Sequence, residues 1–183
     1  VTIISPENGS ILHRKSLRLA YTLSDGVITD VSLNGLPISI RTNETLLLPS
    51  AGSYELAVSA IDEAGNLTGP VKSSFTYTPF TLTINSGSGS GTYDKDQSIT
   101  IASNQAEIGF EFNTWQIDSG NPNIEDLHSP TTQVTLTDGD ATLTAIYQKD
   151  ITAPIITFSS PTPNTTIPSS PIKVTGSTNE SLK

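Results

Sequence analysis

The sequence lacks two residue types altogether: it contains no cysteine and no methionine. Without cysteine, the chain can form neither a disulfide bond nor a zinc site with thiolate ligands. Without an initiator methionine, it begins directly in a strand-like run at Val1, so we expect it to be a piece of a larger protein. In such a piece, the lack of a signal peptide says nothing about the compartment.

Positive charge is also scarce, because 9 Lys and Arg stand against 18 Asp and Glu, for a formal net charge of -9 at pH 7. An acidic surface repels nucleic acid and anionic lipid. Arg14, Lys15 and Arg18 form the only close basic group, which is typical of a solvated face. No apolar run approaches the roughly 18 residues that a membrane helix requires. We therefore expect no nucleic-acid partner and no membrane insertion.

Helical periodicity is nearly absent. Short runs rich in Thr, Ile, Val and Tyr instead alternate apolar with polar residues. Turn signals interrupt these runs roughly every 8–12 residues, the spacing of β-sandwiches and barrels. The hydrophobic share of 34% and the charged share of 15% are not those of a disordered chain. The sequence therefore predicts an all-β protein.

Residues 1–78 contain about seven strand-like runs, the number found in an immunoglobulin-like sandwich. Asn34 and Gly35 separate two apolar runs and predict a type I′ hairpin, since both residues accept a positive φ. Pro37 has no amide hydrogen, so the returning strand is expected at a sheet edge. Tyr54 begins the penultimate strand just after a turn. We expect its hydroxyl to bond the backbone as a tyrosine corner rather than to meet a partner.

Residues 79–149 contain five or so strand-like runs and the single tryptophan. The Gly-Ser run at residues 86–91 lacks the Lys-Ser/Thr ending and the following helix of a phosphate-binding loop, so it predicts a flexible hairpin loop. Trp115 is expected in the core, and the alternative is an exposed platform for a ligand such as a sugar. Simple alternation places Phe112 and Trp115 on opposite faces. Burial of both therefore requires a bulge or a face switch.

Residues 150–183 repeat the beginning of the chain. Residues 156–161 (ITFSSP) match residues 1–6 (VTIISP), and residues 171–174 match residues 16–19. The period of about 155 residues is longer than that of a solenoid, so whole domains repeat as beads on a string. Some 30 residues are too few to bury a core. We therefore expect the truncated start of a second sandwich, poorly anchored from about residue 155 onward.

Residues 52–66, with the sequence GSYELAVSAIDEAGN, resemble the end of bacterial immunoglobulin-like and fibronectin type III-like repeats. The shared pattern is G-x-Y-x-L-x-V-x-A-x-D-x-A-G-N. Residues 150–154 (DITAP) resemble the linker that often opens the next module. The resemblance covers residues 1–78 and 150–183. It implies an immunoglobulin-like β-sandwich in the first segment and a truncated one in the last.

Residues 79–148 resemble the divergent B-repeat modules first named from internalins. The similarity lies in residues 91–93 (GTY), 109–115 (GFEFNTW) and 143–147 (LTAIY). Thr114 departs from the family, which usually has glycine before the tryptophan. The resemblance implies a small compact β module, similar to a β-grasp, at residues 79–149. It also implies a place in a bacterial surface protein.

The sequence offers few residues for catalysis. Its two histidines, His13 and His128, lie in different segments and in turn-like contexts, so we expect exposed loop residues, no catalytic residue and no bound cofactor. Carboxylates gather in turns, where they usually only shape the turn. The alternative is a calcium ion at a module junction, with Asp62 and Asp150 as contributors to the six to eight oxygens that calcium needs.

We therefore expect a non-enzymatic tandem repeat of a bacterial protein, extracellular or at the cell surface, that acts as a structural spacer or an adhesion module. Its expected partners are neighbouring modules of the same chain and an unidentified surface protein or glycan. The alternative is a carbohydrate-binding accessory module of a larger secreted enzyme. That alternative predicts that Trp115, Tyr93 or Tyr147 is exposed on a flat face.

Overall fold

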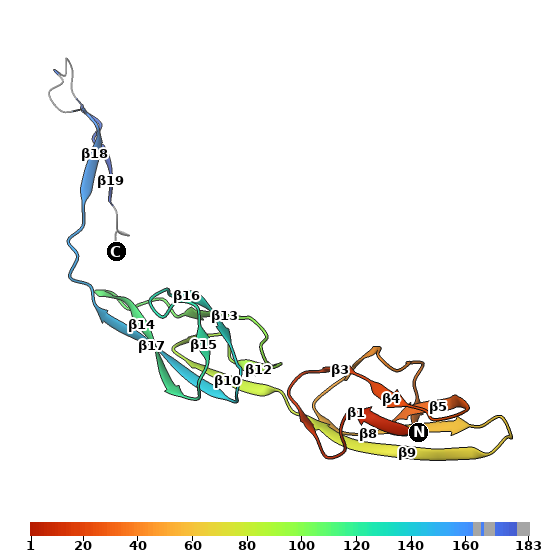
Figure 1. Cartoon of the computed structure of the whole chain (residues 1–183). Helices are drawn as coiled ribbons and strands as arrows, with labels where there is room; N and C mark the ends of the chain where they lie inside the picture. The colour runs from red at the N-terminus through yellow and green to blue at the C-terminus, as the bar shows by residue number, and fades with distance from the viewer. Residues whose placement is uncertain (163–165, 167–170, 179–183) are drawn as a thin grey trace.

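A computed structural model describes residues 1–162, 166 and 171–178. Within these ranges the chain forms 19 β-strands in six sheets. The same ranges contain no helix, and so none that could cross a membrane. The all-β prediction is confirmed. Figure 1 shows two modules that follow one another, with a strand hairpin beyond them.

The first module is built from nine strands around one hydrophobic core. They are β1 (Thr2–Ser5), β2 (Ile11–Leu12), β3 (Ser16–Arg18), β4 (Ala20–Thr22), β5 (Val27–Leu33), β6 (Leu36–Pro37), β7 (Thr45–Leu47), β8 (Gly52–Ile61) and β9 (Leu67–Tyr77). A five-stranded sheet has the order β2-β9-β8-β5-β6, and β1-β4 and β3-β7 form two short sheets. The core draws buried residues from the large sheet and from the short pairs, as a sandwich does.

Local signals in this module act as the sequence predicts. Asn34 and Gly35 have φ angles of 51° and 78° and connect β5 to β6, so the type I′ hairpin is confirmed. Pro37 lies on β6 at the edge of the five-stranded sheet, where its missing amide hydrogen breaks no ladder. On β8, the alternate residues Leu56 and Val58 are completely buried, because one face of the strand covers the core.

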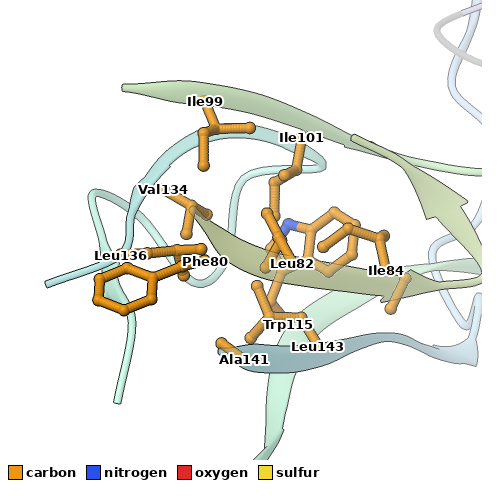
Figure 2. Packing of buried hydrophobic residues seen from close by; sticks show 11 residues of the cluster. Phe80, Leu82, Ile84, Ile99, Ile101, Trp115, Val134, Leu136, Ala141 and Leu143 are labelled. Atoms are coloured by element: carbon orange, nitrogen blue, oxygen red, sulfur yellow. The ribbon is translucent and has the colours of Figure 1, made fainter. Parts of the chain in front are cut away.

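The second module is built from eight strands. They are β10 (Phe80–Asn85), β11 (Gly87–Ser88), β12 (Gly91–Tyr93), β13 (Ile99–Ser103), β14 (Phe110–Ser119), β15 (Asn123–Ile124), β16 (Thr131–Thr135) and β17 (Ala141–Lys149). They form two four-stranded sheets, β12-β10-β17-β14 and β11-β13-β16-β15. The first and last strands, β10 and β17, pair in parallel at the centre of one sheet. Residues from both sheets form the core of the second module (Figure 2). This core shares no residue with the core of the first module.

A bulge in β14 resolves the alternation of Phe112 and Trp115. The register against β17 shifts between Phe112 and Thr114, so an extra residue enters the strand at Asn113. Trp115 is then buried, and Phe112 packs against the same core with its ring centroid 5.6 Å from that of Trp115. The bulge is therefore what lets both rings contribute to one core.

The Gly-Ser run connects the antiparallel strands β10 and β12, so the predicted hairpin is present, but the connection is not a free loop. Residues Gly87 and Ser88 form β11 and pair with β13, whereas β12 returns to pair with β10 in the other sheet. A Cβ on Gly87 would lie 2.6 Å from the Ala102 carbonyl oxygen and 3.0 Å from the Trp115 ring. Only the expectation of a flexible loop was wrong, because the small residues here serve close packing.

The last described strands are β18 (Ile156–Ser160) and β19 (Thr175–Thr178), and they repeat the pairing of β1 with β4. Ile3 opposes Tyr21 in the first module, and Phe158 opposes Gly176 in the hairpin. Each pairing also shifts register two residues later. All five residues of β18 are exposed, whereas Ile3 packs against the first core. Residues 163–165, 167–170 and 179–183 of the predicted third module lie outside the described residues.

Candidate functional site

The most extensive polar contact between the modules joins two loops at their junction. One loop, between β2 and β3, belongs to the first module, and the other, between β12 and β13, belongs to the second. Only Thr78 and Pro79 separate β9 from β10, so the end of one module lies beside the start of the next. We call this contact the junction clasp and define it as His13, Arg14, Lys15, Tyr77, Asp94, Lys95 and Asp96.

Hydrogen bonds between backbone and side chains hold the clasp together. The Lys95 amide donates to the His13 carbonyl oxygen over 2.7 Å. In the opposite direction, the Lys15 amide donates to Asp94 Oδ1 over 3.1 Å. Arg14 and Asp96 form an ion pair beside them. The clasp thus joins the loops by two backbone donors, one from each module, and by one pair of opposite charges.

His13 closes the clasp on the side of the linker. Its Nδ1 lies 2.7 Å from the Thr78 carbonyl oxygen, and since a carbonyl can only accept, Nδ1 carries the proton. The imidazole stacks on Phe80 with a centroid distance of 4.4 Å. Phe80 belongs to the core of the second module. A side chain of the first module therefore covers one end of the second core.

Tyr77, the last residue of β9, supplies the buried part of the clasp. Its hydroxyl donates to Asp94 Oδ1 over 2.6 Å. Burial raises the pKa of Tyr77 to about 12, and the hydrogen bond and negative charge of Asp94 act in the same direction. The phenol therefore stays a neutral donor at any physiological pH.

The acidic loop is held in place by its own module before it meets the first. Asp96 adopts a positive φ of 60°, and its amide donates to the Leu136 carbonyl oxygen over 2.9 Å. Gln97 closes the turn, with its amide bonded to the Asp94 carbonyl and its side-chain oxygen accepting from the Asp94 amide. The carboxylate of Asp94 is therefore already oriented toward the junction.

Sequence reasoning did not find this site. Arg14 and Lys15 are exposed, as the sequence predicts, but the solvated face that they form also contacts the second module. The expectation that His13 is an exposed loop residue is wrong, because its ring is half-buried against Phe80. The available signal was charge complementarity, since residues 13–15 are His-Arg-Lys and residues 94–96 are Asp-Lys-Asp. Nothing local showed that the two segments meet, because they lie about 80 positions apart.

Trp115 lies in the core and not on the surface. Its side chain is 2% exposed, and its indole Nε1 donates to the Ser129 carbonyl oxygen over 3.0 Å. Figure 2 shows the ring surrounded by Leu82, Ile84 and Ile101. The core interpretation agrees with the structure. The alternative of a ligand platform at Trp115 is wrong, because no face of the indole is open to a sugar.

Asp62 and Asp150 lie at opposite ends of the two modules, after β8 and after β17 (Figure 1). Asp62 accepts from the Asn66 side chain and amide over 2.8 Å each, and these bonds lower the pKa of Asp62. Asp150 Oδ1 accepts from the Thr152 amide over 2.9 Å. The structure does not bring the two carboxylates together, so they cannot share one ion within this chain.

No group of three or more His, Asp or Glu side chains that could hold a metal ion occurs in residues 1–162, 166 and 171–178. Calcium binding at either carboxylate stays a prediction. His128 is exposed, and its Nδ1 lies 3.1 Å from the Asn113 carbonyl oxygen. The Nδ1 atoms of both histidines thus face backbone carbonyls.

Tyr54 forms the tyrosine corner that the sequence predicts. Its hydroxyl donates to the Ser50 carbonyl oxygen over 2.5 Å and accepts from the Ser50 amide at 3.3 Å. The ring stacks on Phe75 with a centroid distance of 5.5 Å. The side chain therefore stabilises the first module from within.

Comparison with known proteins finds a family model that matches the second module. Residues 80–151 match the family model described as the divergent InlB B-repeat domain. This family is associated with bacterial surface proteins. No curated protein and no solved structure matches the chain. The predicted divergent internalin-type B-repeat module in the second part of the chain is thereby confirmed.

Proposed function

We propose that this chain is a non-enzymatic structural spacer of a bacterial surface protein, in which the junction clasp holds two unlike modules at a fixed angle. The observation that carries the proposal is the clasp itself. Neighbouring domains move relative to one another by default unless their contact is extensive. Here a linker of two residues is reinforced by bonds that run in both directions between the modules.

The strength of the clasp lies in its contacts with two buried aromatic side chains, Tyr77 within the clasp and Phe80 beside it. Arg14 and Asp96 have side chains that are 52% and 41% exposed, and exposed ion pairs contribute little to stability. Tyr77 and Phe80 are buried, so the bond from Tyr77 to Asp94 and the stacking of His13 on Phe80 are protected from water. Asp94 is the central residue, because it accepts from both Tyr77 and Lys15.

The absence of cysteine allows a direct test. Spin labels at Leu67→Cys and Ile108→Cys would sit on exposed positions, one in each module. Pulsed electron paramagnetic resonance should give a narrow distance distribution in this doubly labelled chain. Asp94→Ala should broaden it, because both of the bonds to that carboxylate are lost.

Asp30→Ala is the matched control. Asp30 is an exposed carboxylate of β5 that takes no part in the clasp, and its removal should leave the distance distribution unchanged. A broad distribution in the labelled chain that still carries Asp94 would contradict the proposal. So would a distribution that Asp94→Ala leaves as narrow as before.

A further inference from the structure

A groove on the second module lies apart from the junction clasp. Its volume is about 310 Å³. Its lining residues come from the turn after β10, from the segment between β13 and β14, and from the strands β14 and β17; they are Ser86, Asn104, Gln105, Glu107, Phe110 and Tyr147. Small-molecule sites in proteins range from about 300 to 1,000 Å³, so the groove suits a small ligand.

Two aromatic side chains form the apolar part of the groove. Tyr147 is fixed in place, because its hydroxyl donates to the Asn104 carbonyl oxygen over 2.7 Å and its ring meets Phe112 edge-on at 6.2 Å. Phe110 is 46% exposed. Ile108 beside it is also exposed, although it does not line the groove. A rigid ring and a half-exposed ring thus face solvent at one place.

The polar part of the groove consists of side chains without internal partners. Among the described residues, the amides of Asn104 and Gln105 and the carboxylate of Glu107 make no side-chain hydrogen bond or ion pair. The backbone beneath them is well held, since the Asn104 amide donates to the Ser86 carbonyl oxygen over 2.9 Å. The fold therefore holds this backbone in place and leaves the exposed side chains available to a ligand.

The chemistry of the lining selects the class of ligand. Amide side chains both donate and accept, and a carboxylate accepts, which matches hydroxyl groups that also do both. No cation lines the groove, and its one charged group is Glu107, so an anionic ligand is disfavoured. A sugar ring combines hydroxyls at its rim with an apolar face that can lie on an aromatic ring.

We propose that this groove binds one or two residues of a neutral saccharide, with Phe110 and Tyr147 beneath the ring and Gln105, Asn104 and Glu107 bonded to its hydroxyls. An added peptide strand fits less well. Strand addition requires free backbone donors, and the Phe110 amide already donates to the Glu107 carbonyl oxygen over 3.0 Å. The proposal does not depend on the rigidity of the clasp.

The test begins with the full chain on an array of neutral oligosaccharides that includes chitotriose, cellotriose, maltotriose and lactose. The strongest binder is then titrated by calorimetry. Phe110→Ala should weaken its binding about tenfold through loss of one ring contact. Gln105→Ala should weaken it by a similar factor through loss of hydrogen bonds to hydroxyls.

Ile117→Ala is the matched control, because Ile117 is an exposed apolar residue of the same strand outside the groove. It should leave the affinity unchanged. Thermal melts should coincide for all three variants, since each removes an exposed side chain. Silence across the array, or binding that neither groove substitution weakens, would overturn the proposal. Binding to a peptide library alone would overturn it too.

Discussion

Tyr54 shows how one hydroxyl can stabilise a whole module. Tyr54→Phe removes the donor to the Ser50 carbonyl oxygen while keeping the stacked ring, and it should lower the free energy of unfolding by about 1–2 kcal/mol. Tyr21→Phe is the matched comparison, because the Tyr21 hydroxyl lies 3.5 Å from the Ile40 carbonyl oxygen and makes a weak bond. Urea denaturation of both variants measures the difference. Equal losses would show that the corner is not special.

Tyr77 should make the stability of the folded chain depend on alkaline pH. Folding raises its pKa from 10.0 to about 12, so the folded chain holds the phenolic proton more tightly than the unfolded chain. The resulting stability is fully present below pH 10.0 and is lost as the pH rises toward 12. Urea denaturation at about pH 9 and about pH 11.5 should show this loss, and Tyr77→Phe should reduce it. An identical alkaline loss in that variant would refute the assignment.

At the scale of elements, two glycines distinguish the cost of an unfavourable backbone conformation from the cost of a steric clash. Gly9 and Gly26 have φ angles of 82° and 85°, but a Cβ on Gly9 would meet nothing within 4 Å, whereas one on Gly26 would lie 2.1 Å from the Ile61 carbonyl oxygen. Gly9→Ala should lower the free energy of unfolding by about 1–2 kcal/mol, because of the backbone conformation alone. Gly26→Ala should lower the free energy of unfolding by about 2 kcal/mol more, because the end of β8 must move to make room for the new Cβ.

The two substitutions are compared by urea denaturation of otherwise identical chains. A Gly26→Ala variant no less stable than Gly9→Ala would mean that the turn before β5 yields without strain.

Elements differ in how far local sequence predicts them. The Asn-Gly hairpin is predictable because both φ angles are a property of those two residues. The path of β11 is not, because it depends on Ala102 and Trp115 across the core.

At the scale of the whole molecule, the exposed ion pair of the clasp should contribute less to the rigidity of the junction than the two hydrogen bonds to Asp94. Arg14→Gln, in the spin-labelled chain, should leave the distance distribution between the modules narrow. The reason is that the bonds from Tyr77 and Lys15 to Asp94 remain. The distance distribution of the unsubstituted labelled chain should also stay narrow at high salt, since salt mainly screens exposed charges. A broadened distance distribution in either experiment would show that the ion pair contributes most to the rigidity of the junction.

The hairpin of β18 and β19 should be the least stable described part of the chain. Its β18 residues are all exposed, whereas β8 crosses a buried core. Amide hydrogen exchange should therefore be rapid in β18 and slow in β8, because opening a strand without a core costs little free energy. Slow exchange in both strands would contradict this expectation and would indicate a covering surface over Ile156 and Phe158.

The sequence by itself determined the all-β class, the Asn-Gly hairpin, the tyrosine corner and the B-repeat module. Each of these depends on alternation, turn residues or motifs within short segments. Only the tertiary structure decided that residues 13–15 meet residues 94–96, that Trp115 is enclosed, and that Phe110 and Tyr147 share a groove. These features depend on how sheets pack, which brings together side chains that no local pattern relates.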